Sequence, residues 1–195
     1  MNRLISLSLS IIVTGCLVAC TAPPASKFYT LSPVRSTRTS PAVERVAIAF
    51  DPVTLPELVD RPQMVVRLEP NRVSIDEFAR WAEPLKNQIP RVLAADLEQI
   101  IPGAIVSTYP QHADDTAYRV SVDVQTFDLS ADGTVKLAVL WSVRAPKLGD
   151  RVSGRSVVSG NARGRRYDAF VSAHDRALES VAWDIASATY SMVHP

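Results

Sequence analysis

The chain has 195 residues, 47% of them hydrophobic, with 21 lysines and arginines against 20 aspartates and glutamates. This length and apolar content predict one domain of ordinary size with a hydrophobic core, and they exclude wholesale disorder. The near balance of charge disfavours nucleic acid as a partner, because no general positive field would attract it.

Residues 1–19 have the pattern of a lipoprotein signal peptide. Arg3 is the only charged residue among them, and the apolar run that follows is shorter than the roughly 20 residues of a membrane span. Each of the two cysteines, Cys16 and Cys20, ends a possible cleavage motif. The "LVAC" motif that ends at Cys20 fits better, since Leu is favoured three residues before the acylated cysteine and Ala directly before it. We therefore predict that Cys20 carries the diacylglycerol and palmitate anchor, and that the folded part holds no disulfide or thiolate site.

The residue after the acylated cysteine predicts which membrane holds the lipoprotein. In Gram-negative bacteria an Asp there typically keeps a lipoprotein at the inner membrane, so Thr21 favours the outer membrane, with the protein facing the periplasm.

Residues 20–40 are predicted to be an acylated linker. Within it "FYTLSP" (28–33) is too apolar for a free tether and is expected to dock on the domain. A single α+β domain is expected to occupy residues 41–195.

Alternation and turn residues predict the first elements of this domain. A strand is expected at 46–50, followed by two short strands on either side of a turn at 69–71. Residues 76–103 are predicted to be mostly helical, with Pro90 either kinking the helix or lying in an early turn. A short strand is expected at 104–109.

The second half has the pattern of an antiparallel meander. Alternation predicts strands at 118–129 and 135–143, joined by a hairpin turn at 130–134. The apolar parity changes near Gln125, which indicates a β-bulge. A weaker strand, at a sheet edge, is expected within 151–164.

The final segment is the clearest helix, with Asp168 as its candidate N-cap. Its apolar positions repeat every three or four residues: Val171, His174, Leu178, Val181, Ile185, Ala188 and Met192. Together the elements predict an α+β fold, in which two main helices pack on one face of a mostly antiparallel sheet.

The sequence holds no arrangement typical of an enzyme. His112, in "PQHADD", lacks metal-ligand spacing, His174 falls on an apolar helix stripe, and His194 is next to last. The "DGT" at 132–134 is better explained by the hairpin turn than as a phosphatase motif. No nucleophile elbow, P-loop or dinucleotide fingerprint occurs. We predict a protein that is not an enzyme, with no catalytic residue, metal site or cofactor.

A basic cluster precedes the last helix. It consists of Arg163, Arg165 and Arg166. One explanation is a solvated loop, and the other is a contact with phosphate head groups or with an acidic partner.

Four stretches together resemble one family. They are the lipoprotein motif ending at Cys20, "FYTLSP", "LVDRPQMVVR" (58–67) and "RWAEPLKNQIPRVLAADL" (80–97). In this order and spacing they are similar to the ABC-type transport auxiliary lipoproteins (PqiC/YmbA-like). The resemblance implies a non-enzymatic, lipid-anchored accessory protein. It would work with an ABC permease and an MCE-domain protein that move phospholipids between the inner and outer membranes.

On this resemblance we expect a partner-binding face within the third and fourth stretches. Its candidate residues are Arg61, Pro62, Gln63, Met64, Arg67 and Trp81. The alternatives are that residues 61–63 only shape the start of a strand, and that Trp81 covers the core.

Two other functions stay open at this stage. One is an adaptor for envelope assembly, unrelated to lipid traffic. The other is a periplasmic hydrolase that uses His112 or Asp115. A homo-oligomer formed through edge strands is also possible.

Overall fold

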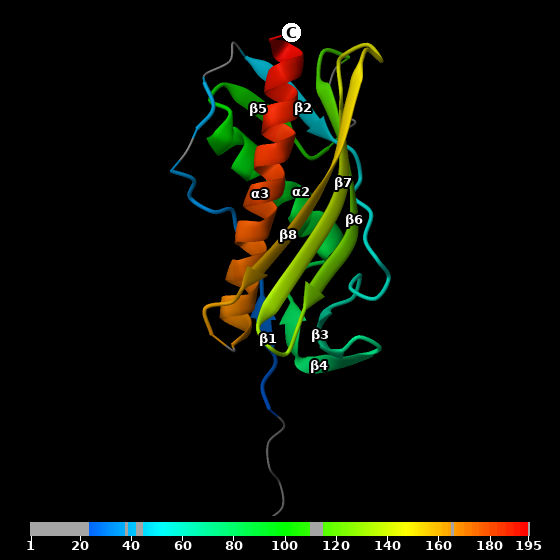
Figure 1. The fold of residues 1–195 in the computed structure, drawn as a ribbon, viewed down its shortest axis with the longest axis vertical. Coiled ribbons are helices and arrows are strands. Elements are labelled where there is room, and N and C mark those ends of the chain that lie inside the picture. Colours follow the sequence, from blue (N-terminus) through cyan, green and yellow to red (C-terminus); the bar gives the residue numbers. More distant parts are fainter. Residues whose placement is uncertain (1–23, 38, 42–44, 110–114, 165, 195) are drawn as a thin grey trace, which may run out of the picture.

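The computed structural model describes residues 24–37, 39–41, 45–109, 115–164 and 166–194. These residues form an elongated molecule with two β-sheets and two helices (Figure 1). The fold class is therefore α+β, as the sequence predicts.

The larger sheet has five strands and is mixed. Its order is β5 (Ala104–Ser107), β2 (Val46–Phe50), β6 (Tyr118–Leu129), β7 (Thr134–Arg144) and β8 (Arg151–Asn161). Strand β2 runs parallel to both β5 and β6, whereas β6, β7 and β8 are antiparallel. The prediction of a mostly antiparallel sheet is wrong here, because β2 inserts between two strands that come later in the chain and reach it through long connections.

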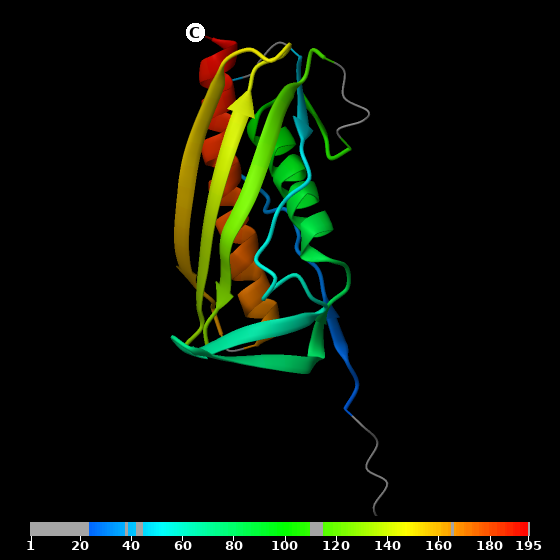
Figure 2. The same cartoon turned by 90° about the vertical axis from the view of Figure 1, so that its right-hand side faces the viewer.

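The smaller sheet has three strands in the order β1 (Lys27–Tyr29), β4 (Arg72–Trp81) and β3 (Gln63–Glu69). Strands β3 and β4 form an antiparallel hairpin, and β1 adds to β4 in parallel. This sheet lies across the end of the molecule from which the N-terminal segment leaves (Figure 2). We call this end the base, and the opposite end, where β7 turns into β8, the distal end.

Helices α2 (Leu85–Ile100) and α3 (Tyr167–Val193) pack against each other and on the same face of the larger sheet (Figure 2). Their apolar stripes meet the inward-facing strand residues in one main core. Its fully buried members include Ile48, Phe50, Leu93, Leu97, Val120, Leu137, Leu178 and Ile185. Burial of each such side chain stabilises the fold by about 1.5–3 kcal/mol.

Both helix starts differ from the sequence-based expectation. Residues 76–81 belong to β4 rather than to a helix, since they pair with β1 on one side and β3 on the other. These ladder hydrogen bonds override a local preference for helix. Helix α2 begins only after Pro84, and Pro90 lies inside it without ending it. In α3 the N-cap is Arg166, so Asp168 lies in the first turn. There its negative charge interacts favourably with the helix dipole.

The meander follows the predicted pattern. The register of β6 and β7 shifts between Val124 and Thr126, which confirms the bulge at Gln125. The backbone N–H of Ser130 donates to the carbonyl of Thr134 over 2.8 Å. Gly133, at φ 94°, supplies the left-handed position of the turn. The "DGT" residues therefore form a hairpin turn.

Candidate functional site

The segment that follows the predicted anchor is fixed to the domain. We call residues 27–36 the N-terminal strap. Leu31 is buried in the core, and its backbone N–H donates to Oε1 of Gln88 over 2.8 Å. The N–H of Ser32 donates to Asp175 over 3.0 Å, and that of Val34 to Asp96 over 3.1 Å. The prediction that "FYTLSP" docks on the domain is confirmed.

The two carboxyl groups that hold the strap are buried between the helices. Burial raises the pKa of Asp96 to about 7, and the nearby charges of Glu179 and Asp175 raise it further, against the hydrogen bond from Val34. Burial likewise raises the pKa of Asp175 to about 6. The strap is therefore attached through groups that titrate close to neutral pH.

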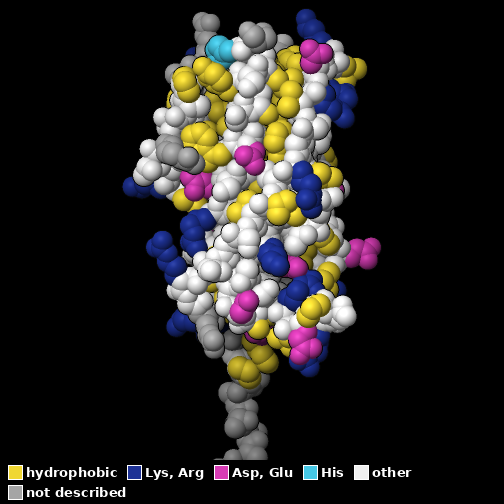
Figure 3. All heavy atoms as spheres, viewed as in Figure 1, with side chains coloured by type: hydrophobic (Ala, Val, Ile, Leu, Met, Phe, Trp, Pro, Cys, Tyr) yellow, Lys and Arg dark blue, Asp and Glu magenta, His cyan; other side chains and the backbone are white. Residues whose placement is uncertain are grey.

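The base carries a hollow beside the start of the strap. It has a volume of about 510 Å³, and its lining includes Phe28, Arg61, Pro62, Arg80 and Lys86. Phe28 is 64% exposed and pairs across the ladder with Arg80, so both side chains point away from the core. Figure 3 shows hydrophobic side chains at this end of the molecule.

Arg61 and Pro62 of the predicted partner face line this hollow, and Gln63 follows them in the chain. Pro62 is exposed, and Gln63 donates to Glu77 over 3.1 Å at the surface. Arg61 is partly exposed, and its Nε makes no hydrogen bond within the described residues.

The other three predicted partner-face residues have structural contacts. Met64 is 2% exposed and Trp81 8% exposed, and both pack in the main core, while an edge of Trp81 also lines the hollow at the base. Arg67 forms a two-bond ion pair with Asp128 of β6, at 2.9 and 3.0 Å. That pair joins the smaller sheet to the larger one.

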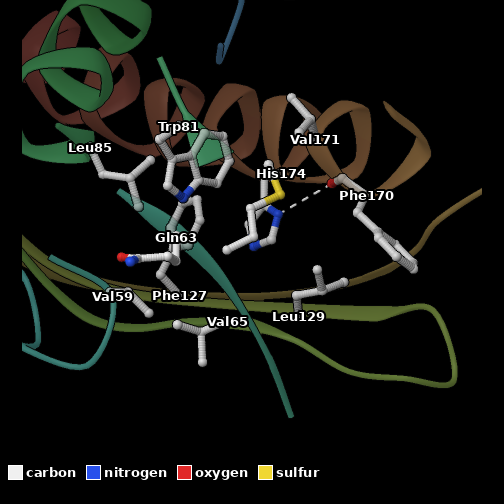
Figure 4. A pocket seen from close by; sticks show the side chains of 11 residues that line it. Val59, Gln63, Val65, Trp81, Leu85, Phe127, Leu129, Phe170, Val171 and His174 are labelled. Carbon is white, nitrogen blue, oxygen red and sulfur yellow. Dashed lines mark hydrogen bonds between the residues drawn. The ribbon is translucent and has the colours of Figure 1, made fainter. Parts of the chain in front are cut away.

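His174 lies in the interior, as its position on the apolar stripe predicts. Its ring stacks on Phe127 with centroids 4.0 Å apart, and Nδ1 donates to the carbonyl of Phe170 over 3.2 Å (Figure 4). Burial lowers the pKa of His174 to about 4, so the ring is neutral at neutral pH. The adjacent gap of about 20 Å³ has room for about one water molecule. This environment fits a core histidine.

The remaining chemical candidates form no site within the described residues. His112, Asp114 and Cys20 lie outside the described residues, and His194 is exposed at the end of α3. Within the part of the chain that the structure describes, no three His, Cys, Asp or Glu side chains are grouped so that they could hold a metal ion.

Two members of the basic cluster, Arg163 and Arg166, lie at the base, where α3 begins (Figure 1). Arg166 is exposed and pairs with Asp168 over 3.2 Å, and Arg163 is exposed. Arg165 lies outside the described residues. The two described arginines are thus at the same end as β1, where the strap begins.

The sequence matches the ABC-type transport auxiliary lipoprotein components over residues 29–186. The chain belongs to this family. Membership makes it a transport auxiliary lipoprotein, a class defined by association with a transport system rather than by catalysis. No curated protein matches the chain significantly. Within the described residues, no helix has the length and apolar character that a membrane span needs.

Two crystal structures resemble the fold. One is of an uncharacterized protein that is 19% identical, with a TM-score of 0.73, and the match covers 85% of this chain and 99% of that one. The other is protein XCC0632 from Xanthomonas campestris, which is 18% identical with a TM-score of 0.61 and the same coverage. At these identities the likeness shows the fold alone.

The groups that hold the strap were not among the predicted site residues, although a signal for them exists. Gln88 and Asp96 fall on the apolar stripe of α2, three or four residues from Leu85, Val92 and Ile100. A polar side chain on such a stripe needs a buried partner. The strap supplies it.

Proposed function

We propose that this protein is a lipid-anchored accessory component of an MCE/ABC-type intermembrane lipid transport system, and that it acts as a docking subunit at the outer membrane. Family membership supports a role beside a transporter. The MCE-domain protein and the permease are the partners that the sequence resemblance implies.

The observation that carries this proposal is the attachment of the strap. Six residues separate Cys20 from Lys27, where β1 begins, and the seven Cα–Cα steps between them span about 25 Å when fully extended. Because Leu31, Ser32 and Val34 are fixed to the helices, an acyl anchor at Cys20 would hold the base close to the membrane. The distal end would then face the periplasm.

This orientation gives the exposed groups of the base a role. Phe28 and the basic residues Arg163 and Arg166 would meet the membrane surface and its phosphate head groups. Arg61, Pro62 and Gln63 would form a partner face that a transport assembly reaches at the membrane. A ring of several copies is compatible with the strand edges, although no number follows from them.

The anchor is tested by mass spectrometry of the N-terminal peptide from purified envelopes. Acyl mass on Cys20, and loss of the protein from the outer-membrane fraction in the Cys20→Ala variant, are the expected results. Acyl mass on Cys16, or a Cys20→Ala variant that still fractionates with the outer membrane, would contradict the proposal.

The partner face is tested by co-purification from crosslinked cells. Arg61→Ala combined with Gln63→Ala should reduce recovery of the MCE-domain protein without changing the fold, as judged by circular dichroism. Arg72→Ala, at an exposed position of the same sheet, is the matched control. Unchanged recovery with the double variant would exclude this face as the contact.

A further inference from the structure

Three arginines stand in register on three neighbouring strands. Arg119 of β6 is directly opposite Arg144 of β7, and Arg144 is directly opposite Arg151 of β8. Directly opposed residues share a face of the sheet. The adjacent Val120 and Val143 are buried, so the arginines lie on the face turned away from the helices. We call these three residues the arginine row.

A row of like charges destabilises the sheet to which it belongs. Like charges directly opposite each other on neighbouring strands destabilise the pairing. Arg119 is paired with Asp51, whereas Arg144 and Arg151 make no ion pair within the described residues. The arrangement therefore has no structural explanation in the fold itself.

The row borders an open hollow. It has a volume of about 380 Å³, and its charged lining residues are the arginine row, Lys147, Asp51 and Asp115. Four positive groups thus face two negative ones, which leaves a cationic surface.

The surface next to the row is mixed, since Leu140 and Trp141 line it together with serine hydroxyl groups. Ser121, Ser142 and Ser153 stand in register on the same face, two positions further along each strand. All three serines line a second hollow that adjoins the first. A lining of hydroxyl groups and apolar side chains suits a peptide, which brings both polar backbone groups and apolar side chains.

The turn beside the row has an unusual backbone. Lys147 and Leu148 both have left-handed conformations, with φ 54° and 58°, although neither is glycine. Strained residues of this kind persist where the surroundings fix them, and they are concentrated at functional sites. Leu148 is 82% exposed, so the turn presents an apolar side chain beside the cationic hollow.

We propose that the arginine row and Lys147 form a docking site for an acidic segment of a protein partner. The site lies at the distal end, opposite the base from which the N-terminal segment leaves (Figures 1 and 2). The assignment to a protein partner rests on the proposed function, because an acyl anchor at the base would point the arginine row away from the membrane that holds the anchor. A partner that crosses the periplasm would reach the distal end first.

Binding is tested with the full acylated chain in non-ionic detergent and a fluorescein-labelled oligoglutamate peptide. The Arg144→Gln/Arg151→Gln double variant should bind it about tenfold more weakly, the equivalent of two exposed ion pairs. Arg35→Gln/Lys136→Gln, which removes the same charge at exposed positions elsewhere, should bind like the wild type. Equal weakening by both double variants would overturn the site. So would row-dependent binding of phosphatidylglycerol vesicles without binding of the peptide, which would assign the row to lipid.

Thermal denaturation separates binding from a structural role. Since the row is repulsive, Arg144→Gln should raise the midpoint of the unliganded protein by a few degrees, and added salt should raise that of the wild type. A lower midpoint for Arg144→Gln would show that the arginine supports the fold.

Photocrosslinking in cells separates this site from the proposed function. A photoreactive residue at position 148 should capture an MCE-domain protein in the wild type, and the Arg144→Gln/Arg151→Gln background should abolish capture. Unchanged capture in that background would overturn the row and leave the proposed function standing. Failure of any transport component to co-purify with the wild type would overturn the proposed function, whatever the peptide result.

Discussion

The backbone N–H of Leu31 donates a buried hydrogen bond of 2.8 Å to Oε1 of Gln88, which lies 57 residues further along the chain. The same amide group donates from Nε2 to the carbonyl of Glu83 over 2.7 Å. One side chain thus joins the N-terminal strap to the turn that starts α2. Because the strap follows the predicted anchor, this bond relates the membrane attachment to the orientation of the domain.

Gln88→Leu should destabilise the protein by about 2–4 kcal/mol, since it leaves the buried N–H of Leu31 and the part-buried carbonyl of Glu83 without partners. The free energy of unfolding is measured by urea denaturation. Asn87→Ala, on the exposed side of the same helix, should change it by less than about 0.5 kcal/mol. A Gln88→Leu variant as stable as the control would show that the strap is not held by this amide.

The stability of the wild type should rise as the pH falls from 7.5 toward 5. The folded pKa of Asp96 is about 7 against 3.8 for an ordinary aspartate, and that of Asp175 is about 6. A raised folded pKa adds stability below the unfolded value, and this contribution is lost as the pH rises through the folded value. His174 acts in the opposite direction between pH 6.5 and about 4, because its pKa is lowered. As the pH falls, the stability gained from the two carboxyl groups exceeds the stability lost through the one imidazole.

Asp96→Asn should remove much of this pH dependence and stabilise the protein at pH 8 by about 2 kcal/mol. Oδ1 of the asparagine can still accept the hydrogen bond from Val34. Denaturation midpoints from pH 5 to 8 check both statements, with Asp150→Asn at an exposed position as control. A pH profile of Asp96→Asn identical to that of the wild type would contradict the assignment.

Gly154→Ala should destabilise the protein by about 1–3 kcal/mol, the usual cost of overpacking. An added Cβ would lie 2.3 Å from Cζ2 of Trp141, its partner across β7 and β8, which also donates to Ser156. Gly160→Ala is the matched control on the same strand, since its Cβ would meet Val135 at an ordinary 3.7 Å. Thermal denaturation of the two variants should separate them, and equal midpoints would count against the packing described.

Arg67→Lys should destabilise the protein by about 1 kcal/mol, because a lysine cannot reproduce the two parallel bonds to Asp128. Arg72→Lys alters only an exposed pair with Glu69 and should have no measurable effect. Urea denaturation distinguishes the two. If Arg67→Lys kept full stability and lost partner binding, Arg67 would belong to a partner face after all.

The periodic parts of this fold are predictable from the sequence, and its long-range pairings are not. The bulge at Gln125 and the turn at Gly133 are encoded by neighbouring residues, so local patterns locate them. Residues 76–81 were expected in a helix because their propensity is helical, and only pairing with β1 and β3 makes them a strand.

The candidate site residues were likewise only partly predictable, because their burial and pairing depend on long-range contacts. Met64 and Arg67 lie in the same stretch as Arg61 and Gln63, but the fold turns Met64 and Trp81 inward and pairs Arg67 with β6. The arginine row was not predicted, because its three members are spread over 33 residues and meet only through the strand register. Sequence spacing alone carries no such information.

The most direct test of the proposed function is the identity of the proteins that co-purify with the acylated wild-type chain from crosslinked envelopes. We expect an MCE-domain protein and an ABC permease, both lost when Cys20→Ala releases the chain from the membrane. Recovery of an envelope-assembly complex without either transport component would contradict it.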